Sequence, residues 1–211
     1  MSVILAFITA MVLILFGTRW ARKPKEEVNE VLVKRYVHSG HAWARITGDG
    51  YVVVGIDDFT QSVVGAVDAV KLPRLLKHVS QGSVGWTLHH GERRLPMVSP
   101  VSGWVVEKNE TVLRNPSLLN SSPYGEGWLF KVKPYKLSHQ LHNLLTGKYA
   151  HQWQDMVRTQ LNRFFTGAPA LTYQDGGIMM TNLCDRCSEH EWNAIAREFF
   201  LNDESTLEMK Q

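Results

Sequence analysis

Cysteine is scarce in this sequence: the 211 residues include only Cys184 and Cys187. Two thiols three positions apart cannot build a disulfide framework, so a reducing compartment fits this chain best. The sequence has no long low-complexity stretch, and its 44% hydrophobic and 20% charged residues are typical of a globular chain. At this length the chain has room for one or two ordinary domains with a real core.

Several signatures of chemistry are also missing. There is no Gly-rich phosphate loop, no pair of carboxylates in a catalytic context and no Ser-His-Asp arrangement. The net charge is only +3, and much of it comes from one cluster, Arg19, Arg22, Lys23 and Lys25. This describes a local patch rather than a nucleic-acid-binding surface. We therefore expect a protein that is not an enzyme and has no nucleic-acid partner.

Charged residues are absent from the N-terminal run. Residues 3–16, VILAFITAMVLILF, show no polar face, and with the next residues up to Trp20 they approach the length that crosses a bilayer. The basic cluster follows the run, so the positive-inside rule places the rest of the chain in the cytoplasm. We expect residues 1–22 to form a single-pass anchor in the inner membrane, followed by a charged linker over residues 23–35.

A cleaved signal peptide is the main alternative to this anchor. Such a peptide has a positive segment before its apolar run, whereas here only the amino terminus precedes it. A buried or re-entrant helix is the second alternative.

Two different sequence patterns follow the linker. From Tyr36 to about Val132, short β-branched runs such as YVVVGI alternate with glycine turns, which predicts strands, and residues 59–70 predict a helix turn leading into a strand. From residue 136 the apolar spacing becomes helical, and Gly147 is expected to divide it into two helices. Ser188 and Glu191 form a capping-box pattern for a last helix to about Leu201.

Four ordered pieces of the β segment form a specific pattern: HAWARITGDGYVVVGIDDFTQSVVG at residues 41–65, Leu72-Pro73, SPVSGWVVEKNE at 99–110, and NPSLLNSSPYGEGWLFKVKP at 115–134. Over residues 36–150 they resemble the H protein of the glycine cleavage system. The resemblance implies a mainly β fold with flanking α-helices, an H-protein-like β sandwich of two sheets (a barrel-sandwich hybrid). The predicted organisation is therefore an N-terminal transmembrane helix, this H-protein-like domain over residues 36–150, and a C-terminal helical extension over residues 151–211. His41 and Asp57 fall within the matching pieces and need no catalytic explanation.

The same resemblance implies a lipoate attached to a lysine at the tip of an exposed hairpin. Counting by the family's spacing, forward from Pro73 and back from Pro100, places Glu92 at that position. A carboxylate cannot form the amide that joins lipoate to an amine, and the nearest lysines in the sequence, Lys77 and Lys108, lie well away. We therefore expect no cofactor.

The tip itself reads His89-His90-Gly91-Glu92-Arg93. His89, His90 and Glu92 can be read as metal ligands, but a coordination shell needs three or four convergent ligands, so we favour a polar, solvated tip that contacts a partner.

Cys184, Cys187 and His190 follow a Cys-x2-Cys-x2-His spacing at the start of the last helix. This allows a dithiol redox couple, with the pKa of Cys187 lowered by the helix dipole, or part of a metal site. No second cysteine pair completes a zinc site, so two reduced thiols in a loop is the simpler interpretation.

Three functions are consistent with these features. The leading hypothesis is a non-catalytic, lipoate-free accessory subunit, anchored to the inner membrane and docked onto other subunits of a membrane complex, such as a redox or respiratory assembly. The second is a redox carrier that uses Cys184 and Cys187, and the third is a lipoyl carrier of glycine cleavage.

Overall fold

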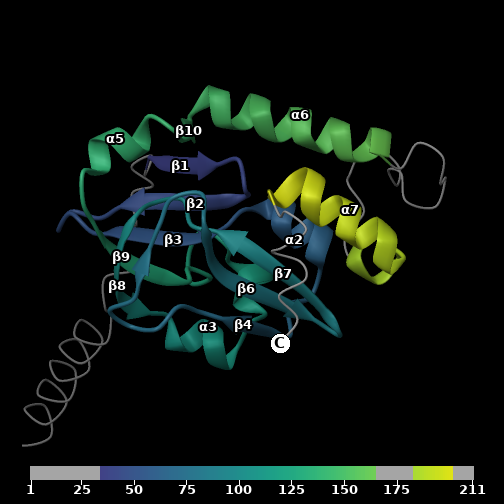
Figure 1. Ribbon diagram of the computed structural model, residues 1–211, viewed down its shortest axis with the longest axis horizontal. Coiled ribbons are helices and arrows are strands. Elements are labelled where there is room, and N and C mark those ends of the chain that lie inside the picture. The colour runs from purple at the N-terminus through teal and green to yellow at the C-terminus, as the bar shows by residue number, and fades with distance from the viewer. Residues whose placement is uncertain (1–33, 165–182, 202–211) are drawn as a thin grey trace, which may run out of the picture. The chain divides into compact units, whose positions relative to one another are not determined.

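The computed structural model describes residues 34–164 and 183–201 (Figure 1). Contacts divide the chain into residues 1–33 and residues 34–211, and every described residue belongs to the second unit. Within the described residues, no helix combines the length and the apolar character that a bilayer crossing requires. The anchor predicted for residues 1–22 lies outside them.

Two antiparallel sheets form the body of the fold. The larger has the strand order β10-β1-β2-β3-β9-β8-β5, and the smaller has the order β4-β6-β7. The strands of the larger sheet are β1 (Arg35–His38), β2 (Ala42–Ile46), β3 (Val52–Ile56), β5 (His78–Val79), β8 (Gly103–Lys108), β9 (Phe130–Pro134) and β10 (Leu145–Thr146). Those of the smaller are β4 (Ala69–Lys71), β6 (Val84–His90) and β7 (Arg93–Val98). This confirms the prediction of a mainly β fold with two sheets.

Six α-helices and a short 3-10 turn flank the sheets within the described residues. They are α2 (Asp58–Val64), α3 (Glu110–Arg114), α4 (Leu118–Ser121), α5 (Leu137–Leu141), α6 (Lys148–Phe164), η1 (Leu183–Asp185) and α7 (Glu189–Phe200). In Figure 1, α6 runs along the β1 side of the large sheet, and α7 lies beside α2. The predicted capping box is confirmed, since the Ser188 side chain accepts from the Glu191 amide while the Glu191 carboxylate accepts from the Ser188 amide.

One predicted helix is shorter than expected. The leucine spacing after residue 136 favoured a continuous helix up to Gly147, but Leu145 and Thr146 form strand β10, opposite Val37 and Tyr36 of β1. The edge of β1 offers backbone partners that this short segment satisfies by pairing, and tertiary pairing overrides the local helical spacing. Gly147 does break the pattern, with φ of 55°, and α6 begins directly after it.

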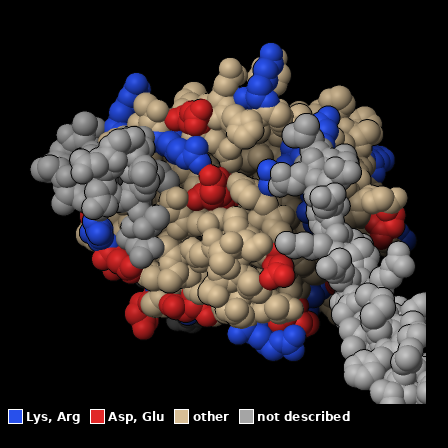
Figure 2. All heavy atoms as spheres, turned by 180° about the vertical axis from the view of Figure 1, so that it is seen from behind, with Lys and Arg blue, Asp and Glu red and all other residues tan. Residues whose placement is uncertain are grey.

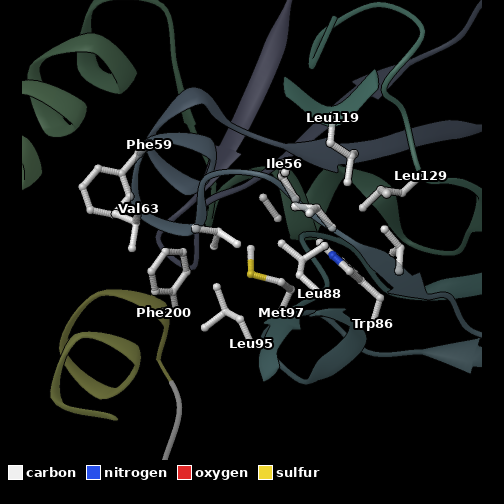
Figure 3. Packing of buried hydrophobic residues seen from close by; sticks show 14 of the residues in the cluster. Ile56, Phe59, Val63, Trp86, Leu88, Leu95, Met97, Leu119, Leu129 and Phe200 are labelled. Carbon is white, nitrogen blue, oxygen red and sulfur yellow. The ribbon is translucent and has the colours of Figure 1, made fainter. Parts of the chain in front are cut away.

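The core lies between the two sheets and extends under α2 and α7. Leu88, Leu95 and Met97 of the small sheet, all at most 1% exposed, meet Ile56 and Phe130 of the large sheet. Figure 3 shows Phe59 and Val63 of α2 and Phe200 of α7 continuing the same cluster. The alternation of buried and exposed residues along each strand is what directs these side chains inward.

Glycine is required where Trp43 packs. Trp43 lies opposite Gly55 in the β2–β3 pairing and is fully buried. A Cβ at Gly55 would lie 2.4 Å from the indole ring, closer than such contacts allow. The Gly within YVVVGI therefore makes room for a tryptophan of the neighbouring strand.

Charge of both signs is spread over the surface. Seen from behind, a stretch of uncharged residues occupies the middle, with lysines, arginines and carboxylates mostly around it (Figure 2). On that face no broad field of one sign is visible, in keeping with the small net charge.

A first prediction concerns α7. Phe200 is fully buried, with its ring 5.9 Å from that of Phe59, whereas the next residue, Leu201, is 50% exposed. Replacing Phe200 by Ala leaves a cavity in the shared core and should lower the free energy of unfolding by about 3–5 kcal/mol. Leu201→Ala should change it by less than about 0.5 kcal/mol. Chemical denaturation of both variants measures this, and equal effects would show that α7 is not part of the core.

Candidate functional site

The position that corresponds to the lipoate attachment point lies at a hairpin tip. His90 pairs with Arg93 at the end of the β6–β7 ladder, so Gly91 and Glu92 form the two-residue turn. Gly91 has φ of 54°, which the turn requires, and both turn residues are exposed. The structure therefore places the Glu92 carboxylate at the outermost point of the hairpin.

Arg93 links this tip to the C-terminal part of the chain. Its guanidinium donates hydrogen bonds to the backbone carbonyls of Cys184 and Cys187, and it lies 3.5 Å from the Cys184 Sγ. The same group lies 5.5 Å from the ring of Trp192 in α7. A planar guanidinium presents several donors in a fixed fork, so one side chain satisfies two carbonyls of the turn at once.

His90 makes the second link. Its Nε2 lies 2.5 Å from Oδ1 of Asp185 in η1, and its Nδ1 contacts the Ala66 carbonyl oxygen. The hydrogen bond with Asp185 is the main cause that raises the pKa of His90 above its ordinary value. On the other side of the tip, the Gly91 amide donates to the Asp68 carboxylate at 2.6 Å. The tip is thus tied both to the loop that follows α2 and to η1.

These contacts correct the expectation of a solvated tip. Glu92 is exposed, but His90 and Arg93, which flank the Gly91-Glu92 turn, contact residues 184–187 of the same chain. The patterns around Cys184 and around His90 were each visible in the sequence. Their meeting was not, because it joins positions more than 90 residues apart.

His89 behaves differently from His90. Partial burial and the nearby charges of Arg94 and Lys71 lower its pKa below the ordinary value. Lys71 belongs to β4, where it lies opposite Thr87 and two residues from Ala69, the partner of His89. The sheet therefore brings Lys71 toward the hairpin, although it is 21 positions from Glu92 in the sequence. Distance along the chain alone does not reveal this proximity.

The two cysteines are buried rather than lying in an open loop. Leu183, Cys184 and Cys187 belong to the core, and both thiols are free. Burial raises the pKa of each thiol to about 11, against the lowering effect of Arg93. The prediction that the helix dipole lowers the pKa of Cys187 was wrong, because desolvation of the thiolate outweighs the favourable charge.

The hypothesised metal ligands do not converge. Over residues 34–164 and 183–201, no group of three or more His, Cys, Asp or Glu side chains could hold a metal ion. This applies to Cys184, Cys187 and His190 and equally to His89, His90 and Glu92.

His41 and Asp57 form a buried pair that attaches the helices to the sheet. The His41 Nδ1 lies 2.8 Å from Asp57 Oδ2, and Oδ1 of the same carboxylate accepts from the Thr60 amide at the start of α2. The imidazole stacks on Phe59 at 4.0 Å and lies 4.8 Å from Trp153 of α6 and 5.2 Å from Phe200 of α7. The pair thus holds α2, α6 and α7 together, a structural role that explains its burial.

The His90–Asp185 contact gives a pH prediction. The folded-state pKa of His90 is raised above 6.5, so the stabilisation that the pair contributes is complete below pH 6.5 and is lost as pH rises through the raised value. Asp185→Asn should therefore lower the melting temperature most in mildly acidic solution and least at alkaline pH. His89 is present in both proteins, so its opposite dependence cancels. A difference that stays constant with pH, or grows toward alkaline pH, would contradict the assignment.

The thiols give a second prediction. A shift from the ordinary 9.0 to about 11 lowers the thiolate fraction about 100-fold at neutral pH. Native Cys184 and Cys187 should react with iodoacetamide at least about 100-fold more slowly than in the unfolded chain. Peptide mass spectrometry of a time course, with a denatured sample as control, measures both sites. Fast alkylation of the native protein would show an accessible dithiol instead.

Comparison with known proteins gives one consistent result. Over 121 residues the chain is 40% identical to a probable glycine cleavage system H protein of Thermococcus kodakarensis, covering 56% of this chain and 90% of the relative. It is 41% identical over 100 residues to the glycine cleavage system H protein of Saccharophagus degradans, covering 47% of this chain and 76% of the relative. A crystal structure of an H protein from Mycobacterium marinum overlaps 57% of this chain and 96% of that chain, with 30% identity and a TM-score of 0.49.

The family match has clear limits along the chain. The sequence model described as "Glycine cleavage H-protein" matches residues 34–156, which include the hairpin and its tip. Residues 183–187, which contact the tip, lie beyond the match. Because the matched range covers more than half of the 211 residues, the chain belongs to the glycine cleavage H-protein family.

Proposed function

We propose that this chain is a lipoate-free H-protein-like subunit that docks onto a protein complex and performs no chemistry itself. The observation that carries the proposal is Glu92 in the turn of the hairpin, at the position where the family resemblance implies a lysine. Acylation needs a nucleophilic amine, and a carboxylate has none to offer. Without the amine the fold has no arm on which to carry a group.

The contacts around the tip support the same conclusion. A carrier arm works by reaching from a free tip into other proteins, and here His90 and Arg93 are held by Asp185 and by the carbonyls of Cys184 and Cys187. Any protein that approached the tip would meet η1 and the start of α7 as well. The residues beside the tip are therefore held by contacts within this chain.

A lipoyl carrier of glycine cleavage is the second candidate, and membership of the family favours it. That function requires an amine that a ligase can reach. The lysine that the sheet brings toward the hairpin is Lys71, exposed on β4 beside β6 rather than in the turn. A carrier of this kind would need attachment at a position other than the tip.

A dithiol redox carrier is the weakest of the three functions. Its reactive form is the thiolate, and burial of Cys184 and Cys187 disfavours that form at physiological pH. Both thiols also contribute to the hydrophobic core, where their packing alone explains their presence.

Location forms part of the proposal. The apolar run of residues 3–16 and the basic cluster after it support an inner-membrane anchor with the folded unit in the cytoplasm. On this basis the host complex is a membrane assembly, and we propose a redox or respiratory one, since such complexes commonly include subunits with one span and one soluble domain.

The decisive prediction is that the native protein never contains lipoate. Intact-mass analysis of the full chain, purified from its own host in mild detergent, should give the unmodified mass, and an antibody against the lipoyl group should not react. Lipoate on any residue, Lys71 included, would contradict the proposal and support the lipoyl-carrier function.

A matched pair of variants tests the role of the tip contacts in the same assay. Glu92→Lys restores an amine but leaves Arg93 bound to the C-terminal turn, so a lipoate ligase should modify it poorly. Glu92→Lys combined with His90→Ala and Arg93→Ala removes both contacts with the C-terminal turn and should be modified to a clearly greater extent. Equal modification of both variants would mean that the turn does not restrict access.

A further inference from the structure

A row of aromatic side chains lies on the exposed side of the large sheet, at its β5 end. Trp104 of β8 lies opposite His78 of β5, with ring centroids 5.2 Å apart, and Tyr135 stacks on His78 at 5.6 Å. Trp104 is 51% and Tyr135 49% exposed. Lys133 of β9 is the cross-strand partner of Trp104 and therefore shares this face. Large rings rarely stay half exposed in such a group unless something covers them.

Two residues beside this row have unfavourable backbone conformations. Leu76 has φ of 60° and is 75% exposed, and Lys136 has φ of 48° and is also exposed. The Leu76 amide donates to the Val105 carbonyl at 2.8 Å, and the Val105 amide donates to the Lys77 carbonyl at 3.0 Å, so the turn is fixed against β8. An exposed leucine gains little from packing within the fold, and a left-handed leucine costs free energy. Neither property is explained by the stability of this chain.

Among the described residues, the charge that remains unpaired around the row is positive. Lys77, Lys133 and Lys136 form no ion pair with any of the described residues. Residues 69–91 and 127–154, which supply most of this region, contain no Asp or Glu. The one carboxylate of β8, Glu107, is already paired with Lys131 at 2.6 Å. Positive charge that no described carboxylate pairs, placed around exposed rings, favours an acidic ligand.

We propose that the aromatic–basic surface formed by Leu76, His78, Trp104, Lys133, Tyr135 and Lys136 binds an acidic segment of a protein partner that also carries apolar side chains. The proposal rests on the proposed docking function and names the face that performs it. His90 and Arg93 beside the hairpin tip already contact the chain's own C-terminal turn, so we assign docking to another surface. Aromatic anchors with a charged rim are the composition of binding hot spots.

Two other classes of ligand are outcomes of the test. A nucleic acid would leave Leu76 without an apolar partner against the phosphates. A lipid surface would be identified by the lipid adducts that it forms at position 104.

The test uses photo-cross-linking of the full chain in its native host. A photoreactive phenylalanine analogue replaces Trp104 and, in a matched control, Tyr149, an aromatic residue of α6 that is 61% exposed. We expect a protein adduct at position 104 with roughly tenfold greater yield than at 149, and a cross-linked peptide that contains Asp or Glu. Lys133→Glu with Lys136→Glu should abolish the adduct, and replacing the acidic residues of that peptide by Lys should restore it.

Leu76→Gly separates binding from stability. Glycine adopts this conformation without strain, so the melting temperature should rise by about 2–4 °C, while the adduct at position 104 should fall roughly tenfold. A more stable protein with an unchanged adduct would remove Leu76 from the surface and overturn the proposal.

Adducts with lipid or nucleic acid, no excess over the Tyr149 control, or a cross-linked peptide without acidic residues would also overturn it. If the chain then still lacks lipoate and still co-purifies with a complex, the proposed function stands and docking uses another face. Lipoate on the native chain would reject the proposed function whatever the adducts show.

Discussion

The structure around the hairpin tip depends on one side chain, Arg93. Arg93 is the first residue of β7 and directly follows Glu92. Its guanidinium donates hydrogen bonds to the backbone carbonyls of both cysteines in the turn that precedes α7. Those carbonyls lie at the edge of the core, where an unpaired backbone group is costly. Because one arginine satisfies both carbonyls, it fixes the conformation of residues 184–187. These residues directly precede the N-cap of α7 and so position its first turn. The hairpin and the C-terminal helix are therefore parts of a single packing unit.

On the proposed function, the fold of the family is separate from its chemistry. The sandwich of this chain depends on its alternating strands, on the glycine opposite Trp43 and on the buried His41–Asp57 pair. The chemistry implied by the resemblance needs one amine at a free tip, and this chain has a carboxylate there. Since Glu92 is exposed and lies outside the core, the residue at this position can differ without disturbing the fold.

Much of the fold could be predicted from the sequence, because local rules decide it. The strand alternation, the helix turn after Asp57 and the capping box of Ser188 all depend on residues within a few positions of one another. The short strand β10 could not be predicted, since Leu145 takes its conformation from pairing with Val37 of a distant strand. The place of Glu92 in the hairpin followed from counting by the spacing of the family that the sequence resembles, but its surroundings did not.

The site was missed for the same reason. Nothing near His90 in the sequence indicates a bond with Asp185, and nothing near Cys187 indicates that burial outweighs the helix dipole. The sequence showed two polar clusters, each of which suggested a metal or redox role when considered alone. The contact between the two clusters explains why both are polar: one is a hairpin tip, and the other is the turn that it contacts.

The central claim is that Arg93 holds the C-terminal turn on the tip, and amide hydrogen exchange tests it most directly. Arg93→Met keeps the length of the side chain and removes its donors. The account predicts faster exchange for the backbone amides of residues 184–188 than in the wild type, spreading into the first turn of α7, with little change in β2 and β3. Unchanged protection of residues 184–188 in this variant would contradict the account.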